Sequence, residues 1–150
     1  MCAKGKKALR GGYYIHLEPN NCLIAVGSYW LPTNILTSCR NEIMVNIEKW
    51  RRIVENGKFI KTFGYPNDGK WEDDTVSEKG FGLSALKTIP KGFPRDYEFA
   101  QYLRMKDYCC WVKVPDNFFK NSDWKKKLIN IVEIGKPMMD MMNSVIDDYE

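Results

Sequence analysis

The sequence lacks most of the short patterns that identify a function directly. It has a single histidine, no Cys-x-x-Cys pair, and no Cys/His group at the spacing of zinc ligands. Glycine-rich phosphate loops, dinucleotide fingerprints and the local signatures of nucleophilic triads are absent as well. We therefore expect no metal site, and the sequence leaves catalytic residues and cofactors unassigned.

Long hydrophobic runs are also missing. No apolar stretch approaches the roughly 18–20 residues that a membrane span needs, and the basic first residues have no apolar segment typical of a signal peptide. The 5 cysteines are odd in number and have no framework spacing, which favours reduced thiols in a reducing compartment. The sequence therefore predicts a cytoplasmic protein without a membrane partner.

Outside the N-terminus, the positive and negative side chains balance one another. The 150 residues carry 23 Lys and Arg against 19 Asp and Glu, a net charge of +4. The whole excess lies in a segment that contains no acid, at Lys4, Lys6, Lys7 and Arg10. We predict a flexible basic arm over residues 1–10 and one domain over 11–150. A nucleic-acid-binding protein usually has a basic face across its fold, so this distribution argues against such a partner.

Alternating side chains predict the strands. A hairpin is expected over about 12–29, because two runs of strand-forming residues are separated by the turn cluster Pro19-Asn20-Asn21. In its first strand, Tyr14 and His16 lie on one face, and the second strand is apolar throughout. A third strand is expected over about 108–114, with the adjacent cysteines on opposite faces.

Helical periodicity predicts the rest of the fold. Together with the strands it indicates an α+β domain, in which a small, mostly antiparallel sheet is covered by about four or five helices. We expect Asn46 to cap a helix over 47–56 that ends at Gly57, and Pro137 to kink or break the last helix. The other expected elements are a helix from Pro32-Thr33, a helical turn at Phe59 and Phe63, a short strand over 83–89, a helix over 97–104 that Asp96 caps, and a terminal helix from Ser122 or Asp123.

Two segments resemble a known family. The run from Gly12 to Pro19, G-Y-Y-x-H-x-E-P, and the loop Pro90-Lys91-Gly92-Phe93 are similar to the bacterial domain of unknown function 2461 family, whose members are mostly hypothetical proteins. The resemblance implies an uncharacterised protein without an assigned reaction. The chain lacks the family's upstream motif R-x-x-R-D-x-R-F, so we expect it to hold only the C-terminal part of a longer protein. An uncovered strand edge beside the hairpin would then favour self-association or a missing N-terminal segment as partner.

The first functional hypothesis is a polar cleft that binds a small anionic ligand. Its candidate residues are Tyr14, His16 and Glu18 on one strand face, with Lys91 and Arg95 from the turn-rich loop. Imidazole beside a carboxylate has the parts for proton transfer, and the two cations could hold a phosphate or carboxylate. The alternative is that His16 and Glu18 only line a solvated sheet face.

The second hypothesis is a non-catalytic protein-interaction module. Exposed aromatic residues would then contact another protein, and the candidates are Tyr29, Trp30, Trp71 and Phe93. The methionines of the last helix are interpreted as adaptable core filling rather than as a ligand site.

Overall fold

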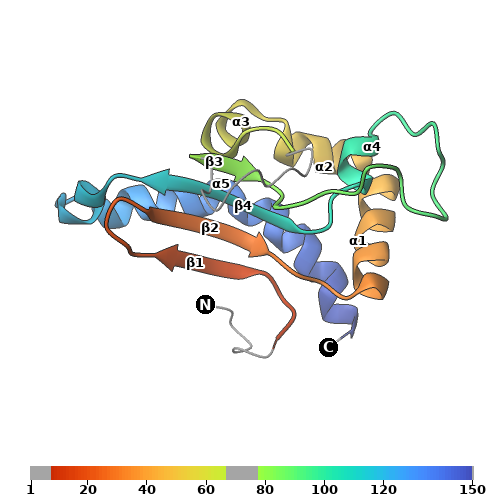
Figure 1. Cartoon of the computed structure of the whole chain (residues 1–150), viewed down its shortest axis with the longest axis horizontal. Coiled ribbons are helices and arrows are strands. Elements are labelled where there is room, and N and C mark those ends of the chain that lie inside the picture. Colours follow the sequence, from red (N-terminus) through yellow and green to blue (C-terminus); the bar gives the residue numbers. More distant parts are fainter. Residues whose placement is uncertain (1–7, 67–77, 150) are drawn as a thin grey trace.

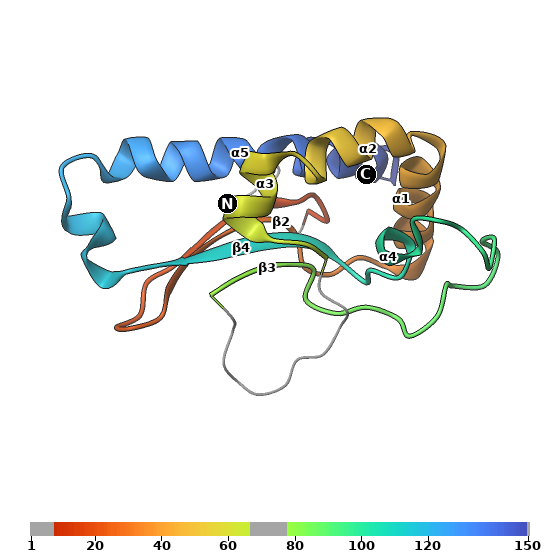
Figure 2. The same ribbon diagram turned by 90° about the horizontal axis from the view of Figure 1, so that it is seen from above.

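The sheet has four antiparallel strands in the order β1-β2-β4-β3, and the computed structural model describes residues 8–66 and 78–149. Its strands are β1 (Gly12–His16), β2 (Cys22–Ser28), β3 (Lys79–Phe81) and β4 (Tyr108–Val114). The helices α2, α3 and α5 lie on one side of the sheet, and no helix of the described part covers the other side (Figures 1 and 2). This second side is called the open face below.

The helices confirm the α+β prediction. The α-helices are α1 (Thr33–Val45), α2 (Ile47–Val54), α3 (Gly57–Phe63), α4 (Ala100–Leu103) and α5 (Trp124–Ile146), with 3₁₀-helices η1 (Asp116–Lys120) and η2 (Asp147–Tyr149). The hairpin and the strand over 108–114 lie where the side-chain alternation predicts them.

The main core lies between the sheet and its helices. Trp50 of α2 is fully buried, and its ring contacts those of Tyr102 and Tyr108 edge-on, with centroid distances of 5.8 and 5.6 Å. Four methionines of α5 complete this core, as the sequence predicts: Met138, Met139, Met141 and Met142. Cys110 belongs to the same core, whereas Cys109 faces the opposite side of the sheet.

The last helix runs through Pro137 without a break, so of the two predicted outcomes, a kink or a break, the break is wrong. Proline removes one hydrogen bond of the helix, but Pro137 lies on the solvent side, where water can satisfy the carbonyl that loses its partner. Packing holds the helix on both sides of the proline. Gly135 lies so close to the sheet that an added Cβ would be 3.0 Å from Val26 Cβ, and Met138 is fully buried.

Three other local predictions are corrected by the structure. The Asn46 side chain makes no capping bond to α2 and instead donates to Glu42 Oε1. Gly57 does not end a helix but begins α3, where Asn56 Oδ1 accepts from the Phe59 N–H at 3.0 Å. Asp96 caps nothing, because α4 begins only at Ala100.

The segment 83–89 forms no strand. Asp107 accepts the backbone N–H groups of Leu83 and Ser84, so these donors are not available to a strand ladder. The outer neighbour of β4 is instead the short strand β3. The sequence did not indicate this strand.

The predicted arm lies mostly outside the described residues. At its end Arg10 forms an ion pair with Asp147, 3.0 Å from Nε to Oδ1. The backbone N–H of Gly11 donates to Asn143 Oδ1 at 2.7 Å, which ties the start of β1 to α5.

Candidate functional site

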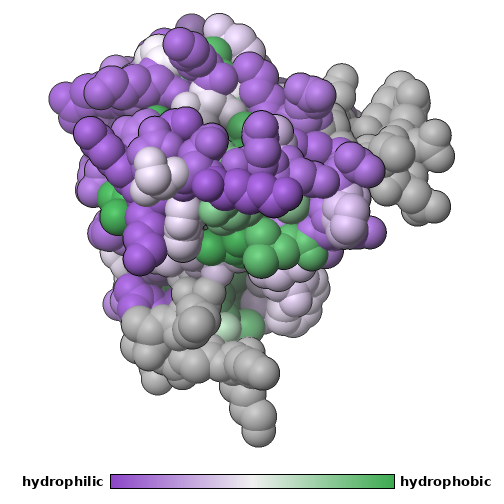
Figure 3. All heavy atoms as spheres, turned by 90° about the vertical axis from the view of Figure 1, so that its left-hand side faces the viewer, coloured by the Kyte–Doolittle hydropathy of each residue, from purple (hydrophilic) through white to green (hydrophobic). Residues whose placement is uncertain are grey.

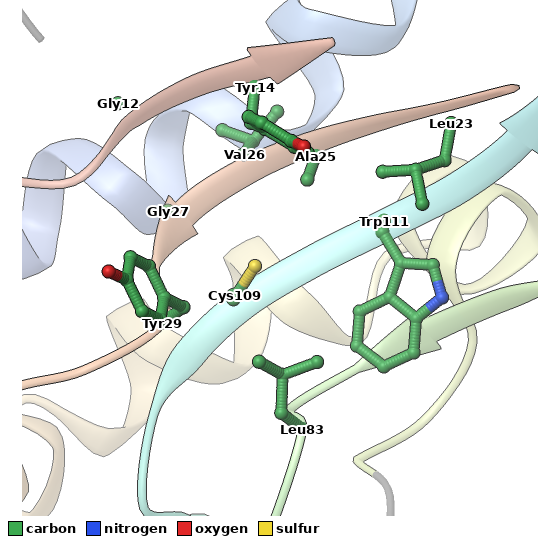
Figure 4. A pocket seen from close by; sticks show the side chains of 10 residues that line it. All are labelled: Gly12, Tyr14, Leu23, Ala25, Val26, Gly27, Tyr29, Leu83, Cys109 and Trp111. Atoms are coloured by element: carbon green, nitrogen blue, oxygen red, sulfur yellow. The ribbon is translucent and has the colours of Figure 1, made fainter. Parts of the chain in front are cut away.

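The open face of the sheet contains an apolar pocket of about 410 Å³. Large side chains surround small ones in it, as Figure 4 shows. The lining residues are Gly12, Tyr14, Leu23, Ala25, Val26, Gly27, Tyr29, Leu83, Cys109 and Trp111. This volume lies within the range of roughly 300–1,000 Å³ that is usual for small-molecule sites.

Strand register explains why a hollow forms here. Tyr14 lies opposite Ala25 and Ala25 opposite Trp111, so one small residue separates two large rings across three strands. In the neighbouring row Gly27 lies between Gly12 and Cys109, and all three are small. The small residues therefore form a floor that Tyr14 and Trp111 flank on the neighbouring strands.

Gly27 could not be replaced without strain. Its φ is +118°, and an added Cβ would lie 2.1 Å from the carbonyl oxygen of Tyr108. Only glycine combines this conformation with such a close approach of two strands. The depth of the floor is thus set by the backbone of β2 itself.

A hydrogen-bonded chain of polar side chains begins at the rim of the pocket. The Tyr14 hydroxyl lies 2.9 Å from His16 Nδ1, and His16 Nε2 lies 2.8 Å from Glu18 Oε2. Asn21 Nδ2 donates to the same Glu18 oxygen at 2.7 Å. The bonds from His16 and Asn21 lower the pKa of Glu18, because they stabilise its carboxylate.

The structure brings together three of the five residues of the predicted polar cleft. Tyr14, His16 and Glu18 are linked, but Lys91 and Arg95 lie in the loop between β3 and α4, at the opposite end of the sheet from the β1–β2 turn (Figures 1 and 2). Arg95 Nη1 donates to the Ile89 carbonyl within that loop, at 2.7 Å. Neither cation lines the pocket.

Sequence reasoning missed the pocket, although β2 carries a signal for it. This strand is apolar on both faces, and its outward positions hold small residues at Ala25 and Gly27. Leu83 is a wall of the pocket because Asp107 fixes its backbone N–H, with both carboxylate oxygens within 3.0 Å. That contact spans the β3–β4 connection and has no local sequence pattern.

The pocket also contains the buried thiol of Cys109. Burial, followed by the nearby Asp107 charge, raises the pKa of Cys109 to about 12, so the thiol is neutral at physiological pH. Cys22, Cys39 and Cys110 are free thiols as well. Within residues 8–66 and 78–149, no group of three His, Cys, Asp or Glu side chains could hold a metal ion.

The aromatic residues expected on the surface divide into two groups. Tyr29 and Trp30, which follow β2, are 77% and 62% exposed, whereas Phe93 is buried. Trp71 lies outside the described residues. At the end of the molecule that carries the β1–β2 turn, hydrophilic side chains surround a hydrophobic area of the surface (Figure 3).

Comparison with known protein families gives a match over most of the chain. A family model described as "Conserved hypothetical protein (DUF2461)" matches residues 1–141. The match begins at residue 1, so the expectation that the chain holds only the family's C-terminal part is not borne out. Neither a curated protein nor a solved structure gives a significant match. Among the residues that the structure describes, no helix has the length and apolar character needed to cross a membrane.

Proposed function

This chain belongs to the family of conserved hypothetical proteins (DUF2461), whose function is unknown, and we propose that it binds a small, mainly apolar molecule in the pocket on its open face. One observation carries the proposal: large apolar side chains enclose a floor of small residues on the sheet face that the described helices leave uncovered. An apolar ligand there would remove both its own surface and that of the pocket from water.

The walls of the pocket favour a flat or ring-shaped ligand. Tyr14 and Trp111 flank Ala25 in the strand register, and the Trp111 indole lies over Gly80 of β3, so it offers a flat aromatic face to a ligand. The Tyr14 hydroxyl is the polar group at the rim, and Tyr14 as a whole is 57% exposed. The ligand therefore carries one polar group, which reaches the rim while its apolar part fills the floor. This replaces the anionic ligand of the sequence hypothesis, because the two cations lie elsewhere.

Thermal melts against a panel of apolar compounds test this function. A ligand that binds only the folded chain raises the melting midpoint by mass action. The decisive variant is Ala25→Phe, which places a ring on the pocket floor. The matched control is Val45→Phe, a similar enlargement at an exposed position of α1 outside the pocket.

We expect a midpoint shift in the wild type and in Val45→Phe, and none in Ala25→Phe. A ligand that still shifts the Ala25→Phe variant by the same amount would show that it binds elsewhere. Melts of all three proteins without ligand establish that each remains cooperatively folded.

Protein interaction is a second candidate, supported by the exposed rings of Tyr29 and Trp30. These two residues directly follow β2. Its neighbour β1 forms one edge of the described sheet. Size-exclusion chromatography with light scattering tests self-association: a dimer that Trp30→Ser converts to a monomer would support this candidate. A protein that is monomeric at all concentrations tested would contradict self-association through these rings.

We also propose a cytoplasmic location. The free thiols of Cys22, Cys39, Cys109 and Cys110 support a reducing compartment. A bacterial source, one domain over 11–150 and a flexible arm over 1–10 remain expectations from the sequence.

A further inference from the structure

We propose that Tyr14, His16 and Glu18 form a proton relay that accepts a proton from the acidic O–H group of a phenol or enol bound in the pocket. This inference rests on the proposed function, because it needs a ligand on the pocket floor. It adds the chemical class of that ligand and the direction of proton movement.

The hydrogen-bonded chain has a defined direction. An ionised Glu18 can only accept, so His16 Nε2 must carry the proton of the 2.8 Å bond between them. A neutral imidazole with a proton on Nε2 has an acceptor at Nδ1. In the resting state that the relay requires, the imidazole is neutral, and the Tyr14 hydroxyl, 2.9 Å from Nδ1, donates to His16.

This direction determines what Tyr14 offers to a ligand. Its single proton points to His16, so its oxygen presents only lone pairs to the pocket. A ligand can meet them with an O–H donor, whereas a carboxylate or ketone would find no partner. The relay thus selects for donors rather than for the anions of the sequence hypothesis.

Position supports the same conclusion. In Figure 4 the Tyr14 hydroxyl points along the strands toward the end of the pocket where Leu23 lies. Leu23 is the cross-strand partner of His16, so the relay and the pocket share two adjacent rows of the sheet. Lys113 lies opposite Leu23 on β4 and so faces the same side as His16. Among the described residues, Glu78 and Asp116 line a hollow together with Lys113, so two carboxylates accompany this cation.

The proton step balances without a further reactant. The O–H bond of the ligand breaks and its proton goes to Tyr14 Oη, while the Tyr14 proton moves to His16 Nδ1. The products are a ligand oxyanion and an imidazolium that donates from Nε2 to Glu18. No net charge is created, and the reverse transfer restores the resting state.

A nitrophenol tests the relay, since its ionised form has a separate visible absorption band. It is titrated with wild-type protein at a pH where free nitrophenol is mostly neutral. Quenching of tryptophan fluorescence measures binding, and Trp111→Phe assigns that signal to the pocket. We expect the wild type to show quenching and the nitrophenolate band together.

The relay variants are Tyr14→Phe and His16→Gln, and the matched control is Tyr65→Phe, which removes a hydroxyl from an exposed ring outside the pocket. Tyr14→Phe and His16→Gln should keep the quenching and lose the band, whereas Tyr65→Phe should keep both. Quenching without a band in the wild type, or a band that survives in Tyr14→Phe, would overturn the relay and leave the pocket intact. Absence of quenching in the wild type would overturn the proposed function itself.

Discussion

The indole of Trp111 lies directly over Gly80: an added Cβ at Gly80 would be 2.1 Å from Trp111 Cζ2 and 2.3 Å from Cη2. Gly80 and Trp111 are paired across β3 and β4, so the ring occupies the space that a side chain of β3 would fill. The absence of one side chain on β3 thus allows the largest side chain of the pocket wall to lie flat against the sheet.

Gly80→Ala should displace the indole and disturb the pocket. Crowding of a packed site typically costs about 1–3 kcal/mol of folding free energy, and we expect a loss of that order together with a changed tryptophan emission. Urea unfolding followed by fluorescence measures both. Gly57→Ala is the control, because no atom lies within 4 Å of its added Cβ. Equal unfolding midpoints for the two variants would contradict this packing.

Asp107→Asn should change how stability depends on pH. Burial raises the pKa of Asp107 from 3.8 to about 6, although the N–H groups of Leu83, Ser84 and Cys109 oppose the shift. Because the pKa of Asp107 is higher in the folded chain than in the unfolded chain, the folded chain keeps this proton up to a higher pH. The free energy of unfolding therefore falls as the pH rises from about 4 to 6. At roughly 1.4 kcal/mol per unit the cost is on the order of 3 kcal/mol above pH 6.

The variant cannot titrate, so it should not share this loss of stability, although its amide offers the backbone N–H groups one acceptor fewer. Denaturant unfolding at several pH values gives the difference in stability between the two proteins. The stability of the wild type relative to the variant should fall as the pH rises from 4 to 6. A constant difference would show that Asp107 has an ordinary pKa.

Pro137→Ala should stabilise the chain. Proline inside a helix destabilises the folded chain by about 3 kcal/mol relative to alanine. The alanine variant has a more flexible unfolded state, which offsets up to about 1 kcal/mol of this gain. We expect a gain of about 1–3 kcal/mol in the free energy of unfolding, measured in urea. Asn130→Ala, an exposed change in the same helix, should have a much smaller effect. A destabilised Pro137→Ala protein would show that the proline fits a local bend that the core requires.

The two asparagines before α2 and α3 should differ in importance. Asn56→Ala removes a capping bond to the Phe59 N–H and should cost about 1 kcal/mol. Asn46→Ala removes only a bond to the exposed Glu42 side chain and should be nearly neutral. Thermal or urea unfolding of both variants gives the comparison, and the reverse order would contradict the helix boundaries described above.

The strands β1, β2 and β4 could be predicted from the sequence because their period of two is a local property, whereas the three-residue strand β3 is too short to show one. The order of the residues alone places Tyr14, His16 and Glu18 on one face, and it separates Cys109 from Cys110. The continuity of α5 could not be predicted, since the packing of Gly135 and Met138 against the sheet outweighs the local effect of Pro137. Helix propensity describes single residues and does not include the packing of the helix against the sheet.

The pocket depends on register, which the sequence does not specify. Its walls come from β1, β4 and the segment after β3, and Ala25 becomes a floor only because Tyr14 and Trp111 are its neighbours. The loop with Lys91 and Arg95 was combined with the hairpin on chemical grounds, but the fold places it at the other end of the sheet.

The most decisive experiment is a titration of the protein with N-phenyl-1-naphthylamine, a neutral apolar fluorescent dye whose one N–H group is a hydrogen-bond donor, in the wild type, Ala25→Phe and Val45→Phe. A pocket on the open face predicts saturable binding of one dye per chain in the wild type and in Val45→Phe, and its loss in Ala25→Phe. Equal binding by all three folded proteins would contradict a ligand site at Ala25.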